Sequence, residues 1–334
     1  LTGLGKKTLC VLDSMSRMTK GRYGELTPLG ARQHRGIAER MYKNFPEIFK
    51  GQVEIDARST VVIRCILSMM AECNQLQALN PKLRFKNDAS YHDMNYMNFS
   101  GDPHIKEMRK SPEVKAAKEA IRKEHIHPER LMKTLFTNTD YLKWKVDAGE
   151  LMTSLFDVAS NMQSHDTDMQ LYSLFTDEEC YDLWSCNNLY WYLTHACSPV
   201  TDGLMPYREA DLLRNILDRA DAALKEGKNQ ATLRFGHESC LLPLVALLEL
   251  NHYGESYPDV EKLSEQWRAY DIFPMASNVQ FVFFHKKGSN DVLVKVLLNE
   301  KEAKLPVKTD VAPYYHWKDV ESYYREKLDK YQHI

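Results

Sequence analysis

The chain has 334 residues, 43% of them hydrophobic, which is enough to bury the core of one large domain or two ordinary ones. Forty-four Lys and Arg face 46 Asp and Glu, so the net charge of −2 excludes an overall field that gathers nucleic acid or anionic lipid, and a bound anion needs a local site. No apolar run approaches the roughly 20 residues of a membrane span.

The first part of the chain predicts helix, helix, strand and helix. Residues 2–18 have a moderately amphipathic helical pattern. A second helix is predicted over residues 27–44, because threonine caps free amides and the proline after it fits a first turn. Residues 52–57 alternate as a half-buried strand does. Ser59 or Thr60 can cap the helix that follows this strand.

The middle of the chain, from about residue 91 to residue 227, is predicted to be helical throughout. Strand-like runs vanish here, and helical patterns follow one another. They cover residues 105–124, 147–162, 177–196 and 208–225. This part is typical of a helical insertion.

Strands return in the last third. Residues 231–235 predict a strand, followed at once by an apolar helix over 240–250. Residues 279–285 and 292–298 are dense in valine and phenylalanine, and the Lys287-Gly288-Ser289-Asn290 turn between them is typical of a hairpin. We therefore predict an α/β fold. Its α/β domain comprises residues 1–88 and 228–334, and a helical cap domain over 89–227 is inserted between the two halves.

Metal and cofactor sites are not expected. The seven cysteines are scattered with no Cys-x-x-Cys pair, and His, Asp and Glu show no clustered ligand spacing. The compartment cannot be read from these cysteines.

The string Arg234-Phe235-Gly236-His237-Glu238-Ser239 stands between a predicted strand and a predicted helix. Ligands of open α/β sheets bind at the carboxyl ends of strands, where the next helix offers free N–H groups to an anion. His237 is thus placed for phosphate, and Glu238 could protonate a leaving group. A plain structural hydrogen-bonding pair is the alternative.

A second strand-turn-helix string runs from Arg58 through Ser59-Thr60 to Arg64. An arginine in the first turn of that helix can place two N–H donors on phosphate oxygens. An ordinary surface ion pair is the alternative here.

Together these strings resemble the histidine acid phosphatases of branch 2, and in particular the multiple inositol polyphosphate phosphatases and phytases. Arg64-Cys65-Ile66-Leu67-Ser68 is similar to the arginine helix of that family, and the string from Arg234 to Glu238 to its second signature. Further similar segments lie in the family's order. They are Glu25 to Gly30 with Gln33, Met275 to Val279, Leu297 to Glu300 and Leu305-Pro306.

The resemblance implies a fold and a chemistry. The fold is a histidine-phosphatase-like (phosphoglycerate-mutase-like) central sheet flanked by helices. The activity is hydrolysis of inositol polyphosphates such as phytate through a phosphohistidine, without a cofactor, in a periplasmic or secreted protein. Glu238 and His237 are the expected catalytic residues, and Arg64, Arg58 and Arg234 the expected substrate-binding residues.

Two departures from the family pattern are visible. Its nucleophile lies in an Arg-His-Gly-x-Arg motif, and this sequence has none; Gln33-His34-Arg35-Gly36 reverses the order and falls inside a predicted helix. We expect the motif upstream of Leu1, and no activity from the 334 residues alone. The family's acid usually stands in His-Ala-Glu or His-Asp, whereas Glu238 directly follows His237 and Ser239 comes next.

The sequence offers two alternative functions. A catalytically inactive relative that binds phosphorylated ligands is the main alternative. A P-loop at Gly3 to Thr8 is disfavoured, because the first glycine and the preceding strand of that motif are not in the sequence. Basic residues between Lys106 and Lys123 could contact outer phosphates, although a solvated helix face is the simpler reading.

Overall fold

The structure is a computed structural model that describes residues 1–97, 103–140 and 142–331. It divides into two compact units. One is Leu1–Leu29 with Lys115–Tyr190, and the other is Gly30–Val114 with Trp191–Ile334. The first helix therefore belongs with the helical segment, and the expected division after residues 88 and 227 does not coincide with the unit boundaries.

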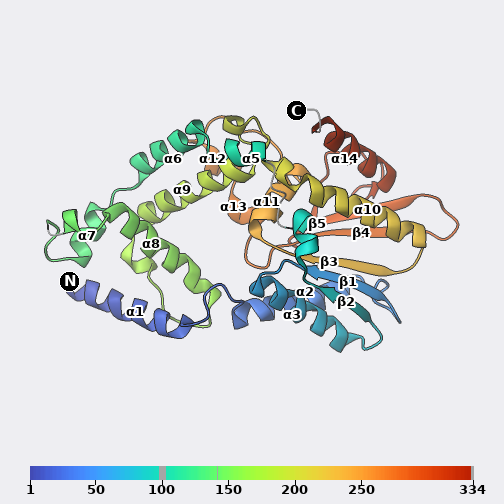
Figure 1. Cartoon of the computed structure of the whole chain (residues 1–334), viewed down its shortest axis with the longest axis horizontal. Helices are drawn as coiled ribbons and strands as arrows, with labels where there is room; N and C mark the ends of the chain where they lie inside the picture. The colour runs from blue at the N-terminus through green and yellow to red at the C-terminus, as the bar shows by residue number, and fades with distance from the viewer. Residues whose placement is uncertain (98–102, 141, 332–334) are drawn as a thin grey trace. The chain divides into compact units, whose positions relative to one another are not determined.

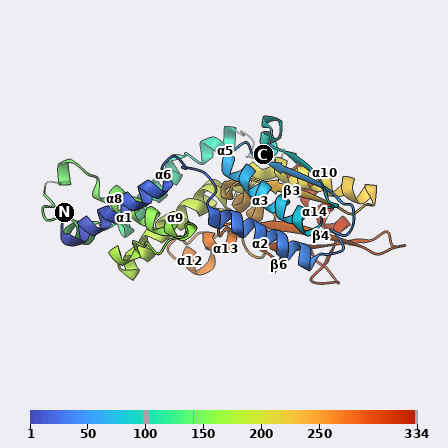
Figure 2. The same cartoon turned by 90° about the horizontal axis from the view of Figure 1, so that it is seen from below.

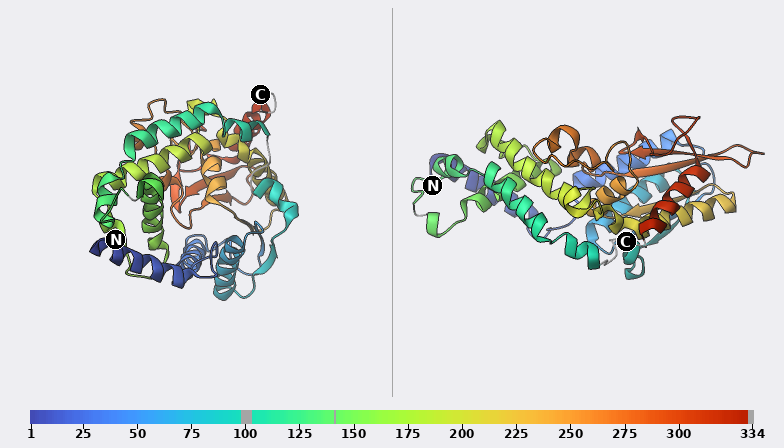
Figure 3. Two further views of the ribbon diagram at one scale, coloured as in Figure 1. Left: turned by 60° about the vertical axis from the view of Figure 1, so that its left-hand side comes forward. Right: turned by 90° about the horizontal axis from the view of Figure 1, so that it is seen from above.

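The smaller unit is helical. Its main helices are α1 (Gly3–Thr19), the end of α6 (Pro112–His125), α7 (Glu129–Leu135), α8 (Ala148–Asn161) and the first part of α9 (Asp177–His195). Met15 of α1 and Leu131 of α7 are buried in one apolar cluster with Met152 of α8. These helices are drawn in blue and green in Figure 3. The helix predicted over 105–124 is two helices, α5 (Pro103–Met108) and α6, since Pro112 begins a new first turn.

The larger unit contains a parallel sheet with the strand order β2 (Arg84–Asp88), β1 (Glu54–Ser59), β3 (Gln230–Phe235). The strand predicted over 52–57 thus lies two residues later. Residues 58 and 234 pair in register, as do Ser59 and Phe235, so β1 and β3 end side by side. Each strand leads through a short turn into a helix, α3 (Ile63–Leu79) after β1 and α11 (Glu238–Leu247) after β3.

Helices α2 (Pro28–Asn44) and α3 cover one face of this sheet (Figures 1 and 2). Strand alternation points Ile55 and Ala57 at this face, where both are fully buried. Ala38 of α2 and Leu76 of α3 pack in the same cluster as Ile55. The polar residues of β1 therefore project from the opposite face, toward α10 (Ala210–Glu226).

The remaining strands form a second, antiparallel sheet. Its order is β4 (Val279–His285), β5 (Val292–Leu298), β6 (Lys301–Ala303), and β7 (Tyr315–His316) also pairs with β5. The predicted hairpin is confirmed with both strand ranges, and the α/β class is confirmed as well. Helix α14 (Trp317–Tyr331) follows β7, and three short helices complete the α-helices of the described residues. These are α4 (Met94–Met97), α12 (Leu263–Gln266) and α13 (Ala269–Ile272).

None of the helices in the described part of the chain is long and apolar enough to cross a membrane.

Candidate functional site

The carboxyl ends of β1 and β3 form the rim on which the candidate site is built. The backbone N–H of Thr60 donates to the carbonyl of Phe235 over 3.0 Å, which joins the two turns just past the strands. The residues that cap α3 and α11 are Val62 and His237, and neither makes a side-chain capping bond. The expectation that Ser59 or Thr60 caps α3 is therefore wrong. Free N–H groups of two helix N-termini flank the rim, an arrangement that favours anions.

Arg64 and His237, which are 173 residues apart in the sequence, meet at this rim. Arg64 is the second residue of α3 and is exposed, and its Nη2 donates to Nδ1 of the half-buried His237 over 3.3 Å. Burial lowers the pKa of His237, the Arg64 guanidinium lowers it further, and Glu238 opposes both. The imidazole of His237 is therefore neutral, and it lies next to the charged guanidinium of Arg64. An anion that binds to this guanidinium would favour protonation of the imidazole.

Two further side chains, those of Thr60 and Cys65, lie close to the ring nitrogens of His237. Oγ1 of the fully buried Thr60 lies 3.2 Å from Nε2 of the imidazole. The buried Cys65 donates from Sγ to the Gly236 carbonyl over 3.1 Å, and the same sulfur lies 3.8 Å from Nδ1. Burial raises the pKa of the Cys65 thiol. Sequence reasoning placed neither Thr60 nor Cys65 in the site, although both stand in the string that carries Arg64.

Glu238 is the first residue of α11, directly after His237. Its side chain is exposed and makes no hydrogen bond or ion pair to any other described residue. It is therefore free to turn toward a molecule held at Arg64 and His237.

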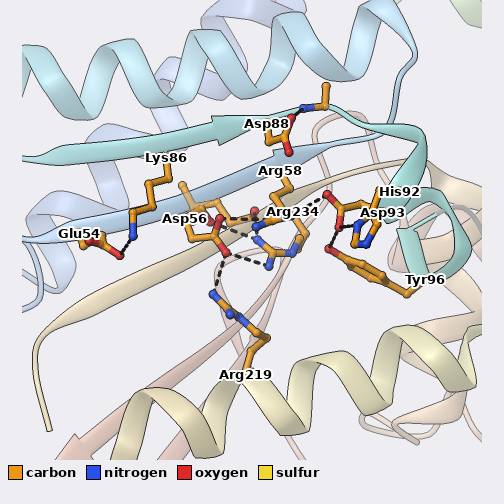
Figure 4. Close-up of polar contacts among 12 residues, drawn as sticks. Glu54, Asp56, Arg58, Lys86, Asp88, His92, Asp93, Tyr96, Arg219 and Arg234 are labelled. Carbon is orange, nitrogen blue, oxygen red and sulfur yellow. Dashed lines mark hydrogen bonds and ion pairs between the residues drawn. The ribbon is translucent and has the colours of Figure 1, made fainter. Parts of the chain in front are cut away.

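Arg58 and Arg234 belong to a different cluster, on the sheet face opposite α2 and α3 (Figure 4). Asp56 is its centre: Oδ1 accepts from Arg58 Nε at 3.2 Å, and Oδ2 accepts from Arg234 Nη2 at 3.2 Å and from Arg219 Nη2 of α10 at 2.8 Å. Arg58 also donates to Asp93 over 2.8 Å. Both carboxylates are buried, with exposed side-chain fractions of 11% and 4%.

The charges of this cluster hold its carboxylates ionised. Burial alone would raise the pKa of Asp56, but Arg234 and Arg58 outweigh it and keep that pKa below its ordinary value. The pKa of Asp93 is also lowered, since bonds from Arg58 and Tyr96 outweigh burial. In the described part of the chain, neither Arg58 nor Arg234 contacts Arg64 or His237. Asp56 was not predicted, although opposite charges two residues apart on one strand were a visible signal.

His34 lies beside the rim, with its ring centroid 6.1 Å from that of Phe235, the last residue of β3. It lies within α2, as the sequence predicted for residues 33–36, and its Nδ1 is 3.2 Å from Glu72 Oε2 of α3. Burial raises the pKa of Glu72. Among the described residues, no group of three or more His, Cys, Asp or Glu side chains is arranged to hold a metal ion.

Comparison with known proteins gives one family. A sequence model described as Histidine phosphatase superfamily (branch 2) matches residues 12–299. Human multiple inositol polyphosphate phosphatase 1 is 28% identical over 134 residues, which is 36% of this chain. In this match the chain spans only 27% of the length of its human relative.

Solved structures of low sequence identity share the fold. The crystal structure of Bifidobacterium longum multiple inositol polyphosphate phosphatase with phosphate has a TM-score of 0.78 at 16% identity, and covers 98% of this chain and 85% of that one. The same enzyme with inositol hexasulfate gives 0.71 at 17% identity, with 96% and 84% covered. The phytase from D. castellii gives 0.67 at 14%, with 98% and 76% covered. The fold expected from the resemblance is thereby confirmed.

Proposed function

The chain belongs to the histidine phosphatase superfamily (branch 2), and from this membership we propose that it is the larger part of a phosphomonoesterase that removes phosphate from inositol polyphosphates such as phytate. The observation that carries the proposal is the meeting of Arg64 and His237 at the paired ends of β1 and β3. The human relative and the Bifidobacterium longum enzyme, by their names, are phosphatases of this substrate class.

In this proposal Arg64 and His237 hold the phosphoryl group. Arg64 is exposed at the rim and its guanidinium can place two donors on phosphate oxygens. His237, once protonated, adds a third charged donor, and the N-terminal amides of α3 and α11 add weaker ones. Such donors stabilise the charge that spreads over the equatorial oxygens during phosphoryl transfer.

Glu238 is the proposed proton donor to the leaving oxygen and the base for the water that follows. It is the carboxyl group next to His237, and its side chain is not engaged elsewhere in the described structure. Protonation is needed most where the leaving group is an alkoxide, as it is for an inositol phosphate.

Substrate binding by Arg58 and Arg234 stays a prediction. Each of the two lies one residue before the end of its strand, near the rim, but their guanidinium groups already neutralise Asp56 and Asp93. A phosphate would have to compete with these carboxylates. We propose that the cluster chiefly fixes the ends of β1 and β3, and so the distance between the two turns.

The nucleophile is proposed to lie outside the 334 residues, since the Arg-His-Gly-x-Arg motif is not among them. The cap domain is likewise a proposal, supported by the finding that the described residues between 89 and 227 form helices and no strand. A periplasmic or secreted location stays a prediction.

Phosphate release from phytate tests the proposal. The pure 334-residue chain should release none, because the attacking histidine is not part of it, and appreciable turnover would contradict the mechanism. In a protein that also carries the motif, Arg64→Ala should lower kcat/KM by about a hundredfold or more. An unchanged kcat/KM would remove Arg64 from the site.

The alternative is a phosphate-binding relative without catalysis. It is favoured by the position of Glu238, one residue before the place where inositol polyphosphate phosphatases of this family usually have their acid, a place that Ser239 takes here. It predicts phytate binding without release of phosphate even when the upstream motif is present.

A further inference from the structure

Both ring nitrogens of His237 have a partner, and the two contacts together locate its hydrogen. Arg64 Nη2 lies 3.3 Å from Nδ1, and because a guanidinium can only donate, Nδ1 must accept. A neutral imidazole then carries its hydrogen on Nε2, which lies 3.2 Å from Thr60 Oγ1. The oxygen of Thr60 is therefore the acceptor of the Nε2–H bond.

Thr60 is itself held in place by its surroundings. It is fully buried, and its backbone N–H donates to the carbonyl of Phe235. The Cys65 thiol, five residues later, donates to the Gly236 carbonyl over 3.1 Å and so ties α3 to the turn that carries His237. Arg64 donates to His237 and His237 donates to Thr60, so the direction of both bonds is set by the guanidinium, which can only donate.

We propose that Thr60 is a positioning residue: its hydroxyl keeps the hydrogen of neutral His237 on Nε2 and so directs the Nδ1 lone pair toward Arg64 and the anion that Arg64 binds. The inference rests on the proposed function for the identity of that anion. A proton taken from solvent when phosphate arrives is then added at Nδ1, and the new N–H points to the side where the anion lies.

The other tautomer, with hydrogen on Nδ1, would lose the bond from Arg64 and would take up the second proton at the wrong nitrogen. A hydrogen on Nδ1 would face the N–H groups of Arg64, two donors without an acceptor between them. The proton that comes with the anion would then be added at Nε2, on the Thr60 side of the ring. Thr60, by accepting the Nε2–H bond, thus helps Arg64 to keep Nδ1 free of hydrogen, and it does so without touching the substrate itself.

The test is long-range ¹H–¹⁵N NMR of the 334-residue chain labelled with ¹⁵N-histidine, with the His237 signals identified from a His237→Gln spectrum. The resting chain should show hydrogen on Nε2 and a bare Nδ1. Thr60→Ser, which keeps the hydroxyl, should give the same pattern. Thr60→Val, which keeps the shape and loses the hydroxyl, should give a mixture of tautomers and bind inorganic phosphate about tenfold more weakly, the effect of about one hydrogen bond.

Three results separate the possible failures. Hydrogen on Nδ1 in the resting wild-type chain overturns the inference before any variant is made. A Thr60→Val spectrum equal to wild type overturns the role of Thr60, and unchanged signals of the other histidines show that this variant is folded. If the tautomer is as expected but inorganic phosphate leaves the His237 signals unmoved, the proposed function fails while the role of Thr60 in setting the tautomer stands.

Discussion

Replacing Asp56 by Asn should loosen the paired ends of β1 and β3 while keeping the shape of the side chain. The carboxylate accepts bonds from three arginines, and each charge-assisted bond contributes about 1.5–3 kcal/mol. Arg58 keeps its bond to Asp93, and Arg219 is 45% exposed, so its pair contributes at most about 1 kcal/mol. Arg234 is only 16% exposed and keeps just two carbonyl partners. We therefore expect the free energy of opening the strand ends to fall by about 2–3 kcal/mol. This is less than the full effect of breaking a buried ion pair.

Hydrogen exchange followed by mass spectrometry measures this loss where it occurs, which matters because a chain of two compact units need not unfold in one transition. Peptides over 54–59 and 230–235 should exchange roughly 30- to 150-fold faster in Asp56→Asn, the equivalent of that free energy. Asp218→Asn is the control: Asp218 lies on α10 in an exposed pair with Arg325, and its loss should change little. Exchange of both strands within threefold of wild type in Asp56→Asn would refute the reasoning.

Two further predictions concern Glu238 and His316. In a protein that carries the upstream motif, Glu238→Gln should slow alkyl phosphates by roughly a hundredfold and aryl phosphates far less, as steady-state assays of both classes would show; equal slowing would argue against an acid role. Hydrogen bonds that the ring donates to Asp291 and then to Asp310 raise the pKa of His316 to about 8. The stability that His316 adds is therefore complete below its unfolded pKa and is lost as the pH rises through about 8. Urea unfolding should show a deficit in His316→Gln at pH 6 that disappears by pH 9; a deficit that persists at pH 9 would contradict this.

Strands with strong alternation or apolar density could be predicted from the sequence, and polar strands could not. Both strands of the hairpin, β4 and β5, lie at the predicted residues. Strand β2 was missed because its residues Arg84–Asp88 are mostly charged or exposed, and only the pairing with β1 makes them a strand. The compact units also differ from the expected domains, since nothing local in the sequence of α1 shows that it packs on α7.

The candidate site was predictable to the extent that it depends on strand ends. Arg64 and His237 each follow a strand, and adjacent parallel strands bring such residues to one rim. The partners of Arg58 and Arg234 depend on Asp93 and on Arg219 of a distant helix, which no local pattern reveals. The error over Thr60 has a similar cause: a threonine before a helix is read as a cap, and here its hydroxyl bonds His237 instead.

The central claim is that Arg64 and His237 form one anion site, and calorimetric titration of the 334-residue chain with inositol hexakisphosphate tests it most directly. We predict that Arg64→Ala and His237→Ala each weaken binding by about tenfold or more, and that the double variant loses less than the product of the two effects because the residues share one ligand. Equal affinity of the wild-type chain and both single variants would contradict the claim.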